Sequence, residues 1–268
     1  MKIGIIFNPE KELAKKIIPE VIKWLKSKGV EVYMLDEAKE LLVDECDIIL
    51  AMGGDGTLLR AARIVGEKGK LICGVNLGKL GFLTDIQVVT LYHALENILK
   101  GNYKVEEKMV LEANFDGKKL YGLNDIVLIG TGTGRMLTTS IYINDEFLST
   151  FSLDGVIVST PTGSTAYSLS AMGPIVHPSL DAILINFICP HTLGARPLVI
   201  DSKSIVKIKL IKEHGVIVAD GQQREPIPEG CYFSVKKAHY KIKIIRSTKY
   251  SFYNILRTKL NWGGLKER

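Results

Sequence analysis

A single acid enclosed by glycines is the feature of this sequence with the clearest chemical use. Gly53, Gly54 and Gly56 surround Asp55, and glycine permits a positive φ and removes the Cβ that keeps a ligand away from the backbone. Thr57, a good N-cap residue, is expected to begin a helix whose free N–H groups and dipole favour an anion at this turn. Since Asp55 is itself an anion, a phosphate cradle alone does not explain it.

Two interpretations of the acid remain open. Asp55 suits a group that accepts a proton from a substrate hydroxyl, or that holds a magnesium ion, beside bound phosphates. The alternative is a tight strand-to-helix turn with a solvated Asp, because short motifs of this kind also occur without a function.

A second concentration of small polar residues lies between Thr160 and Ser170. A strand at Val156–Ser159 leads into this segment, and a short helix is expected from about Ser164. Hydroxyls and free N–H groups at a helix start suit the ribose, phosphate and base edge of a nucleotide. Tyr167 offers a flat apolar surface to a base. A capped surface turn would explain one of these residues, but not so many in one place.

Two smaller groups of residues can also contact a nucleotide. Asn124 and Asp125 precede a strand; a carboxylate accepts hydrogen bonds from both hydroxyls of a ribose, and an amide both donates and accepts. From the residues alone, a turn at the edge of a strand is the better interpretation of this pair. The glycine-rich segment 130–134 is expected to form a loop. The neighbouring Arg135 is a candidate phosphate contact, because a guanidinium donates hydrogen bonds to phosphate oxygens.

These residues need a scaffold, and the first hundred residues predict a Rossmann-like α/β domain at 1–100. Strands and helices alternate, which indicates a parallel sheet with helices on both faces and ligands beyond the carboxyl ends of the strands. A second glycine-punctuated loop, Leu77–Thr84, follows one of these strands. Pro19 is expected to kink or split the first helix. Strands are expected at Lys2–Phe7, Val30–Leu35, Asp47–Met52 and Leu71–Asn76, and helices between Asn8 and Gly29, at Glu37–Leu42, at Thr57–Gly66 and at Thr90–Lys100.

The rest of the chain predicts a β-rich, sandwich-like nucleotide-binding domain at 101–249. Many short strands with turn signals follow one another, including a hairpin with a type I′ turn at Asp116–Gly117. A helix over Tyr250–Trp262, in the segment 250–268, is expected to pack back on the first domain. Further strands are expected at Val110–Phe115, Lys119–Tyr121, Asp125–Ile129, Leu137–Ile143, Glu146–Phe151, Val156–Ser159, Ala182–Phe187, Ile205–Ile211, Val216–Val218, Tyr232–Val235 and Lys241–Ile245, with a turn at His214–Gly215.

The bulk composition is that of an ordinary globular protein. The 268 residues carry 35 Lys and Arg against 29 Asp and Glu, a net charge of +6, which suits anionic ligands but is too weak and dispersed for nucleic acid. Four scattered cysteines form no metal-binding pair, and those at Cys46 and Cys73 are expected to be buried thiols. This pattern indicates a reducing cytoplasm. No apolar run predicts a signal peptide or a membrane segment.

Taken together, these motifs resemble the NAD kinases, which use ATP or polyphosphate, in content, order and spacing over nearly the whole chain. The glycine motif alone is not diagnostic, because diacylglycerol and sphingosine kinases and phosphofructokinases carry similar turns. The segment Thr160–Ser170 combined with Arg196–Val199 is much more specific. The other matching segments are Gly53–Thr57, Leu80–Thr84, Asn124–Asp125, Asp154–Gly155, Pro178–Ala182, His191–Leu193 and Lys259–Gly263.

The resemblance implies phosphorylation of the 2′-hydroxyl of the adenosine ribose of NAD, giving NADP. It implies ATP or polyphosphate as donor, a divalent metal (Mg or Mn), and a homodimer or homotetramer whose nucleotide site borrows residues from a neighbouring subunit. Asp55 is implied as the proton acceptor. No residue is assigned to the metal, and the candidate nucleotide-binding residues are Gly54, Gly56, Thr57, Arg60, Phe82, Asn124, Asp125, Arg135, Asp154, Thr165, Ala166, Tyr167, Ser168, Leu169, Ser170 and Gln222.

Three positions depart from the family pattern. Asp125 stands where Glu is commoner, which shortens its reach by one methylene, and Ser152 stands where many members have Arg. Lys79 occupies a variable position in the second glycine loop. These positions bear on the choice of phosphoryl donor and on the preference for NAD or NADH.

Other functions are weighed against this one. No G-x-x-x-x-G-K-[ST] motif occurs, which excludes the P-loop route, and no G-x-G-x-x-G opens the first βα unit, as a dehydrogenase would require. A lipid or sugar kinase that shares the glycine turn and a non-catalytic NAD(P)-binding sensor remain as alternatives. The lack of an amphipathic basic segment, with which such an enzyme would bind a membrane surface, argues against a lipid kinase.

Overall fold

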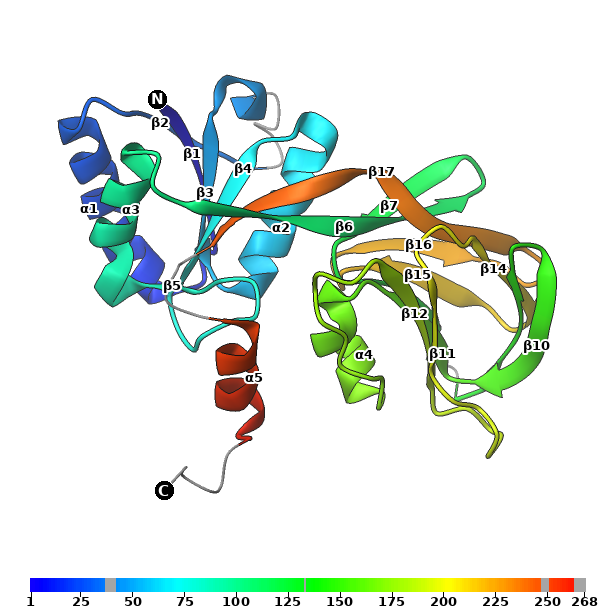
Figure 1. Cartoon of the computed structure of the whole chain (residues 1–268). Helices are drawn as coiled ribbons and strands as arrows, with labels where there is room; N and C mark the ends of the chain where they lie inside the picture. Colours follow the sequence, from blue (N-terminus) through cyan, green and yellow to red (C-terminus); the bar gives the residue numbers. More distant parts are fainter. Residues whose placement is uncertain (37–41, 133, 247–250, 263–268) are drawn as a thin grey trace, which may run out of the picture. The chain divides into compact units, whose positions relative to one another are not determined.

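The computed structural model describes residues 1–36, 42–132, 134–246 and 251–262, and the chain divides into two units (Figure 1). Unit 1 comprises Met1–Glu107 and the segment from Ile242 onward, and unit 2 comprises Lys108–Lys241. Two long strands, β6 (Lys104–Phe115) and β17 (Tyr232–Arg246), contribute residues to both units. The helix predicted at Glu37–Leu42 falls almost wholly outside the described residues, as do Thr133 and Tyr250.

Unit 1 is built on a parallel sheet, as predicted. Its strand order is β2-β1-β3-β4, and β5 and the last part of β17 each pair in parallel with β4. All of β3 is buried, which is typical of a strand covered on both faces. The elements are β1 (Lys2–Phe7), α1 (Glu12–Ser27), β2 (Glu31–Met34), β3 (Ile48–Gly53), α2 (Asp55–Val65), β4 (Leu71–Asn76), β5 (Ile86–Gln87), α3 (Leu91–Leu99) and α5 (Phe252–Leu260).

The helices of unit 1 cover both faces of its sheet. Apolar side chains of α1 and α3 pack with Ile3 and Leu50 in one buried cluster, whereas Leu58 of α2 lies against Gly74 from the opposite face. The chain therefore leaves the neighbouring strands β1 and β3 toward opposite faces. In such sheets the carboxyl ends of the two strands border the crevice in which ligands bind, and Gly53 stands at the end of β3.

Two details of unit 1 differ from the prediction. Pro19 lies inside α1 without splitting it, so the split, one of the two expected effects, is wrong. The carbonyl of Lys15, which loses its helical partner at Pro19, belongs to the exposed face of the helix, where water can solvate it. The helix of the glycine turn begins at Asp55 with Gly54 as its N-cap, not at Thr57, whose side chain is buried.

Unit 2 is a sandwich of two antiparallel sheets. One described sheet has the order β13-β12-β11-β8-β15-β16; the other runs β10-β9-β14-β17, with β6 pairing both β17 and β7. The additional elements are β7 (Lys118–Gly122), β8 (Asp125–Gly130), β9 (Leu137–Ile143), β10 (Glu146–Leu153), β11 (Gly155–Ser159), α4 (Tyr167–Ser170), β12 (Ala182–Ile188), β13 (Leu198–Asp201), β14 (Val206–Lys212), β15 (Gly215–Ala219) and β16 (Gln223–Ile227).

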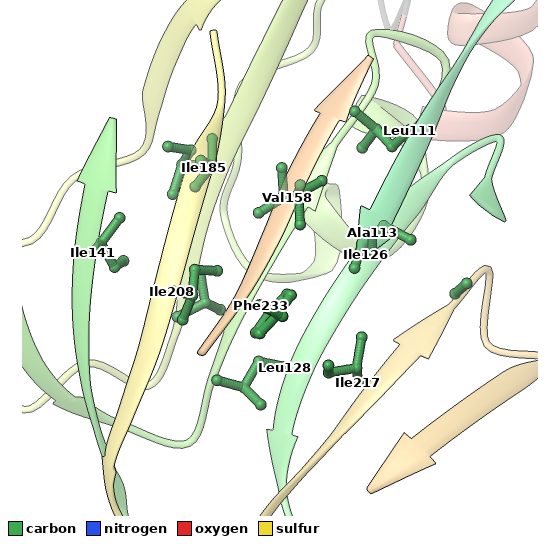
Figure 2. Close-up of a cluster of buried hydrophobic side chains, with 14 of the residues drawn as sticks. Leu111, Ala113, Ile126, Leu128, Ile141, Val158, Ile185, Ile208, Ile217 and Phe233 are labelled. Atoms are coloured by element: carbon green, nitrogen blue, oxygen red, sulfur yellow. The ribbon is translucent and has the colours of Figure 1, made fainter. Parts of the chain in front are cut away.

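The core of unit 2 lies between these sheets (Figure 2). Ile126 and Leu128 of β8 point into it from one sheet, and Ile208 and Phe233 point into it from the other. Alternate residues of β8 and β15 therefore face away from the core. The predicted hairpin turn is confirmed, because Asp116 and Gly117 both have positive φ, at 49° and 75°.

Two predictions for unit 2 are wrong, and the two edge strands β13 and β16 are absent from the prediction. Tyr232–Val235 and Lys241–Ile245 belong to the single strand β17; buried positions switch from odd to even numbers between Val235 and Ala238, and this phase change hides the continuity. The turn centres on Glu213, with φ 71°, and His214, because Gly215 begins β15. Strand β16 was missed because it is polar and contains Pro226, which an edge strand tolerates.

The C-terminal helix α5 belongs to unit 1, as predicted. Ser251 caps its first turn by accepting a hydrogen bond from the Asn254 N–H at 3.2 Å. The side chains of Ile255 and Leu256 are buried. Among the described helices, none is both long and apolar enough to cross a membrane. The thiols of Cys46 and Cys73 are buried, as predicted.

Candidate active site

The glycine turn at the end of β3 places Asp55 at the first position of α2. None of its glycines has a positive φ, so the predicted need for left-handed backbone is wrong. At Gly53 the missing Cβ makes room for Thr57 and not for a ligand, because a Cβ there would lie 2.1 Å from the Thr57 hydroxyl. Gly56 is exposed, and a Cβ there would meet no atom within 4 Å. The side-chain position of Gly56 therefore faces open space at the start of the helix.

The carboxylate of Asp55 is half-buried and oriented by the second glycine loop. Its Oδ1 accepts three hydrogen bonds, from the Leu83 N–H at 3.1 Å, the Thr84 N–H at 3.0 Å and the Thr84 hydroxyl at 2.9 Å. Its Oδ2 accepts one, from the Phe82 N–H at 2.9 Å. Since a carboxylate oxygen has about two acceptor sites, Oδ2 retains the capacity to accept a further donor such as a substrate hydroxyl.

The loop that orients Asp55 is itself held from two sides. Asn76 at the end of β4 accepts the Gly78 N–H at 2.7 Å and donates to the Thr84 hydroxyl at 3.0 Å. Arg246 at the end of β17 donates to the Leu83 carbonyl at 2.9 Å and the Phe82 carbonyl at 3.3 Å. No local pattern in the sequence marks Arg246, because it is far from the loop along the chain.

Three cations of unit 1 lie near the glycine turn or the loop that orients Asp55. The Lys11 ammonium donates to the Gly53 carbonyl at 2.9 Å, and it was not singled out from the sequence because it stands alone between β1 and α1. The Arg60 guanidinium, a predicted nucleotide contact, donates to the Phe7 carbonyl at the end of β1. The Lys259 ammonium of α5 lies 5.8 Å from the centre of the Phe82 ring. Positive charge is thus concentrated beside an acid, as a site for anionic phosphates requires.

Unit 2 holds a hollow of about 670 Å³ on the outward face of β8 and β15. Its floor is apolar and is formed by Val127, Ile129, Val216 and Val218. Its rim carries polar groups, so the hollow offers an apolar surface for a flat ring together with hydrogen-bonding groups, as ligand sites do. The remaining lining residues are Asn124, Asp125, Gly130, Thr131, Gly132, Ala166, Tyr167, Asp220, Gly221 and Arg224.

The polar segment after β11 builds this hollow more than it lines it. The Thr160 hydroxyl donates to the Leu123 carbonyl at 2.7 Å, and the Ser164 hydroxyl donates to the Pro161 carbonyl at 2.7 Å. Both side chains are fully buried, so the expectation that these hydroxyls face a nucleotide is wrong for them. At Gly163 a Cβ would lie 2.0 Å from the Asn124 carbonyl oxygen, so this segment packs directly against the Asn124–Asp125 turn.

The other residues of that segment differ in whether they line the hollow. Ala166 and Tyr167 line the hollow, with Tyr167 40% exposed. Ser168 is fully buried, and the part of the chain that the structure describes provides no hydrogen-bond partner for its hydroxyl, so its candidacy depends on the resemblance alone. Thr165 donates back to the Thr162 carbonyl at 3.2 Å, while Leu169 is half-buried and Ser170 is exposed.

Asp125 is the most unusual ionisable group of the hollow. Its side chain is only 4% exposed, and the described residues provide no hydrogen bond to its carboxylate. Burial raises the pKa of Asp125 to about 7, and the nearby charge of Asp220 adds to the rise. A buried, unpartnered carboxylate that lines a cavity is suited to a ligand that brings its own donors, such as the hydroxyls of a ribose.

The raised pKa of Asp125 makes a prediction about stability. The unfolded chain releases this proton near its ordinary pKa of 3.8, whereas the folded chain holds it up to about pH 7. The contribution of Asp125 to the free energy of unfolding is therefore fully present below about pH 4 and is lost as the pH rises through about 7. Asp125→Asn should raise the free energy of unfolding at pH 8 by on the order of a few kcal/mol and change it little near pH 4.

Urea unfolding at both pH values measures this difference. Asp116→Asn is the matched control, because Asp116 is exposed in a hairpin turn, and it should show no gain that depends on pH. Equal stabilities of Asp125→Asn and wild type at pH 8 would contradict a buried, proton-binding carboxylate.

Asp154 and Arg135 do not join the Asn124–Asp125 end of the hollow. Asp154 precedes β11 and the Thr160 segment follows it, so the two ends are separated by the five residues of the strand, on the order of 17 Å. The Asp154 carbonyl accepts the Gly130 N–H at 3.2 Å. Arg135 is exposed and pairs with Glu213 at 3.4 Å. Gln222 is exposed just after the Asp220–Gly221 turn, at the same end as Asp125.

A resident metal site is not evident from the side chains. Within the described ranges, no three His, Cys, Asp or Glu residues gather closely enough to hold a metal ion. The oxygens of Asp55 already accept four hydrogen bonds. The residues therefore fit a metal such as Mg²⁺ only if it is held mainly by phosphates and water, which is its common mode beside nucleotides.

Comparison with known proteins identifies the family. Residues 36–103 match the ATP-NAD kinase N-terminal domain, and residues 123–247 match the ATP-NAD kinase C-terminal domain. An NAD kinase of Heliobacterium modesticaldum is 40% identical over 97% of this chain and 99% of its own. An NAD kinase of Moorella thermoacetica is 39% identical over 99% of this chain and 91% of its own.

Solved structures show the same fold. A yeast NADH kinase complexed with NADH superimposes with a TM-score of 0.91 at 23% identity, over 99% of this chain and 89% of the other. An NAD kinase from Archaeoglobus fulgidus in complex with ATP gives a TM-score of 0.84 at 23% identity, over 97% and 99%. With both domains matched and relatives near 40% identical over almost the whole length, this chain belongs to the NAD kinase family.

Proposed function

We propose that this protein transfers a phosphoryl group to the 2′-hydroxyl of the adenosine ribose of NAD and so produces NADP. The observation that carries the proposal is the geometry of Asp55, whose oriented carboxylate keeps acceptor capacity on one oxygen beside the open space at the Gly56 Cα. Membership of the NAD kinase family and the hollow of unit 2, which suits a nucleoside, support it. ATP is the proposed donor, with inorganic polyphosphate as a second donor.

In the proposed reaction each unit supplies part of the chemistry. The ribose oxygen forms a bond to the transferred phosphorus while the bond from that phosphorus to the leaving donor oxygen breaks, and the hydroxyl proton passes to Oδ2 of Asp55. Such transfers depend mainly on positioning and on the neutralisation of charge. Lys11 and the start of α2 are the groups of unit 1 proposed to attract the donor phosphates. Asn124 and Asp125 are proposed to hold the dinucleotide.

A divalent metal, Mg²⁺ or Mn²⁺, is proposed to arrive with the donor and to offset the charge of its phosphates. We further propose a cytoplasmic homodimer or homotetramer. The separation of Asp154 from the Thr160 segment along β11 supports a nucleotide site to which Asp154 of a neighbouring subunit contributes. Thr165, Leu169, Ser170 and Gln222 remain proposed contacts of the nucleotide.

A donor panel tests the activity. Purified protein with NAD, magnesium and either ATP or polyphosphate should yield NADP, detected with an NADP-specific dehydrogenase. Parallel reactions with NADH, a diacylglycerol and a hexose test the alternative acceptors. Folded protein that forms no NADP with any donor, or that transfers label only to lipid or sugar, would refute the proposal. Binding of NAD without any turnover would favour a non-catalytic sensor.

The open space at Gly56 provides a sharper test of the phosphate site. Gly56→Ala adds a methyl group where no atom lies within 4 Å, and alanine in a helix is favoured by up to about 1 kcal/mol. The variant should therefore fold at least as stably as wild type. If phosphates approach this backbone, the methyl group displaces them, and kcat/KM for ATP should fall on the order of 10²-fold.

Gly194→Ala is the matched control, because Gly194 also has open space and no positive φ. Unchanged kinetics in Gly56→Ala would show that donor phosphates do not approach the start of α2.

A further inference from the structure

The turn between β15 and β16 places Asp220 against the start of β8. Asp220 and Gly221 have φ of 50° and 69°, a left-handed pair that Asp and Gly tolerate. The Asp220 carboxylate accepts the Leu123 N–H at 2.8 Å, the Asn124 N–H at 2.7 Å and the Asp125 N–H at 3.2 Å. In return, the Asp220 N–H donates to the Asp125 carbonyl at 3.1 Å. Four hydrogen bonds therefore fix the backbone of the Asn124–Asp125 turn.

This arrangement also constrains charge. The three contacts all require an acceptor, which the Asp220 carboxylate supplies, and its charge contributes to the raised pKa of Asp125. Asp125 lies next to it, buried and without a hydrogen-bond partner for its side chain among the described residues. The other titratable or charged groups that line the hollow are Tyr167 of α4 and Arg224 of β16. Asp220 is therefore the negative charge that opposes ionisation of Asp125.

We propose that Asp220 is a positioning residue of the nucleotide site, which orients Asn124 and Asp125 through their backbone and makes NAD binding depend on release of a proton from Asp125. The proposal rests on the proposed function, in that Asp125 receives the ribose hydroxyls of the dinucleotide. An ionised carboxylate accepts from two hydroxyls, whereas a protonated one has less acceptor capacity. NAD should therefore bind more tightly as the pH rises.

The expected pH dependence has a definite sign. Asp125, with its pKa raised to about 7 by burial and by Asp220, must lose its proton before it accepts both hydroxyls. Below pH 7, KM for NAD should rise by up to about tenfold for each pH unit, and above pH 8 it should be level. KM for ATP serves as the internal reference and should not follow this profile.

Asp220→Asn is the central variant. The amide retains one acceptor oxygen but loses the charge, and its NH₂ group opposes one of the three N–H donors. KM for NAD at pH 8 should rise roughly ten- to a hundred-fold, with a smaller change in kcat. The pH at which KM begins to rise should move toward acid by about one unit. Asp116→Asn is the control, since Asp116 occupies the same position of an Asp-Gly turn, with φ of 49°.

A second variant keeps the proposal testable if Asp220→Asn does not fold. Asp125→Asn, with Asp220 intact, should abolish the pH dependence of KM for NAD between pH 6 and 8. An unshifted profile in folded Asp220→Asn, or a retained profile in Asp125→Asn, would overturn the proposal. Failure of the proposed function itself is distinguishable, because wild-type protein would then form no NADP at any pH.

Discussion

Replacement of Asp55 by Asn is expected to lower kcat for NAD phosphorylation by about 10²–10⁴-fold, the usual loss when a general base is removed. The amide oxygen can still accept the three donors that reach Oδ1, so the second glycine loop keeps most of its support. The amide nitrogen, however, would face the Phe82 N–H, and it cannot accept a proton. Steady-state kinetics with saturating NAD and ATP measure the loss.

Glu12→Gln is the matched control for this variant. Glu12 is also the acid at the first position of a helix, and its removal tests whether any loss of negative charge at a helix start slows the reaction. It should leave kcat unchanged. Turnover close to wild type in Asp55→Asn would instead show that Asp55 is a structural residue that holds the 82–84 loop. NAD binding by the variant, measured by calorimetry, shows that unit 2 is intact.

Gly81→Ala is expected to produce the largest combined loss of stability and activity. A Cβ at this position would lie 2.0 Å from Oδ1 of Asp55 and 2.5 Å from the Thr84 hydroxyl. Real atoms do not approach so closely, so either the carboxylate or the loop must move. Overpacking of this kind costs about 1–3 kcal/mol. Displacement of the carboxylate should also lower kcat on the order of 10²-fold or more.

Gly78→Ala in the same loop provides the control, because the nearest atoms to its Cβ lie 3.7 and 3.8 Å away. Urea unfolding and kcat should both stay near wild type in this variant. If Gly81→Ala acts through Asp55, the double variant with Asp55→Asn should lose hardly more activity than Asp55→Asn alone. Both changes would then remove the function of the same carboxylate. Additive losses would show that Gly81 acts on a different part of the site.

The hollow of unit 2 illustrates how function and stability oppose each other. Asp125 is buried without a partner for its carboxylate among the described residues, and its raised pKa costs stability above about pH 7, where the ionised carboxylate is proposed to bind NAD. A hydrophobic or amide side chain would avoid that cost. Retention of an acid there is understandable if the site is completed only when a ligand brings hydroxyl donors.

The elements of the parallel sheet followed from the sequence because their signals are local. The strands Lys2–Phe7 and Leu71–Asn76 are continuous apolar runs bounded by turns, and both were predicted with the bounds that the structure shows. The glycine turn with Asp55 is also recognisable in the sequence, because three glycines around one acid form an unusual local pattern. Errors arose where periodicity changes phase, as in β17, or where an edge strand is polar, as in β16.

By itself, the sequence determined the two-part organisation, the acid of the glycine turn and the resemblance to NAD kinases, since each is carried by local patterns or by motifs that are each short segments of the chain. Only the tertiary structure decided what those residues touch. The four donors to Asp55 come from residues 82–84, and Asp220 reaches Asn124 from far along the chain. Hydrogen bonds over such separations depend on how strands are paired, and local residue patterns do not encode that pairing.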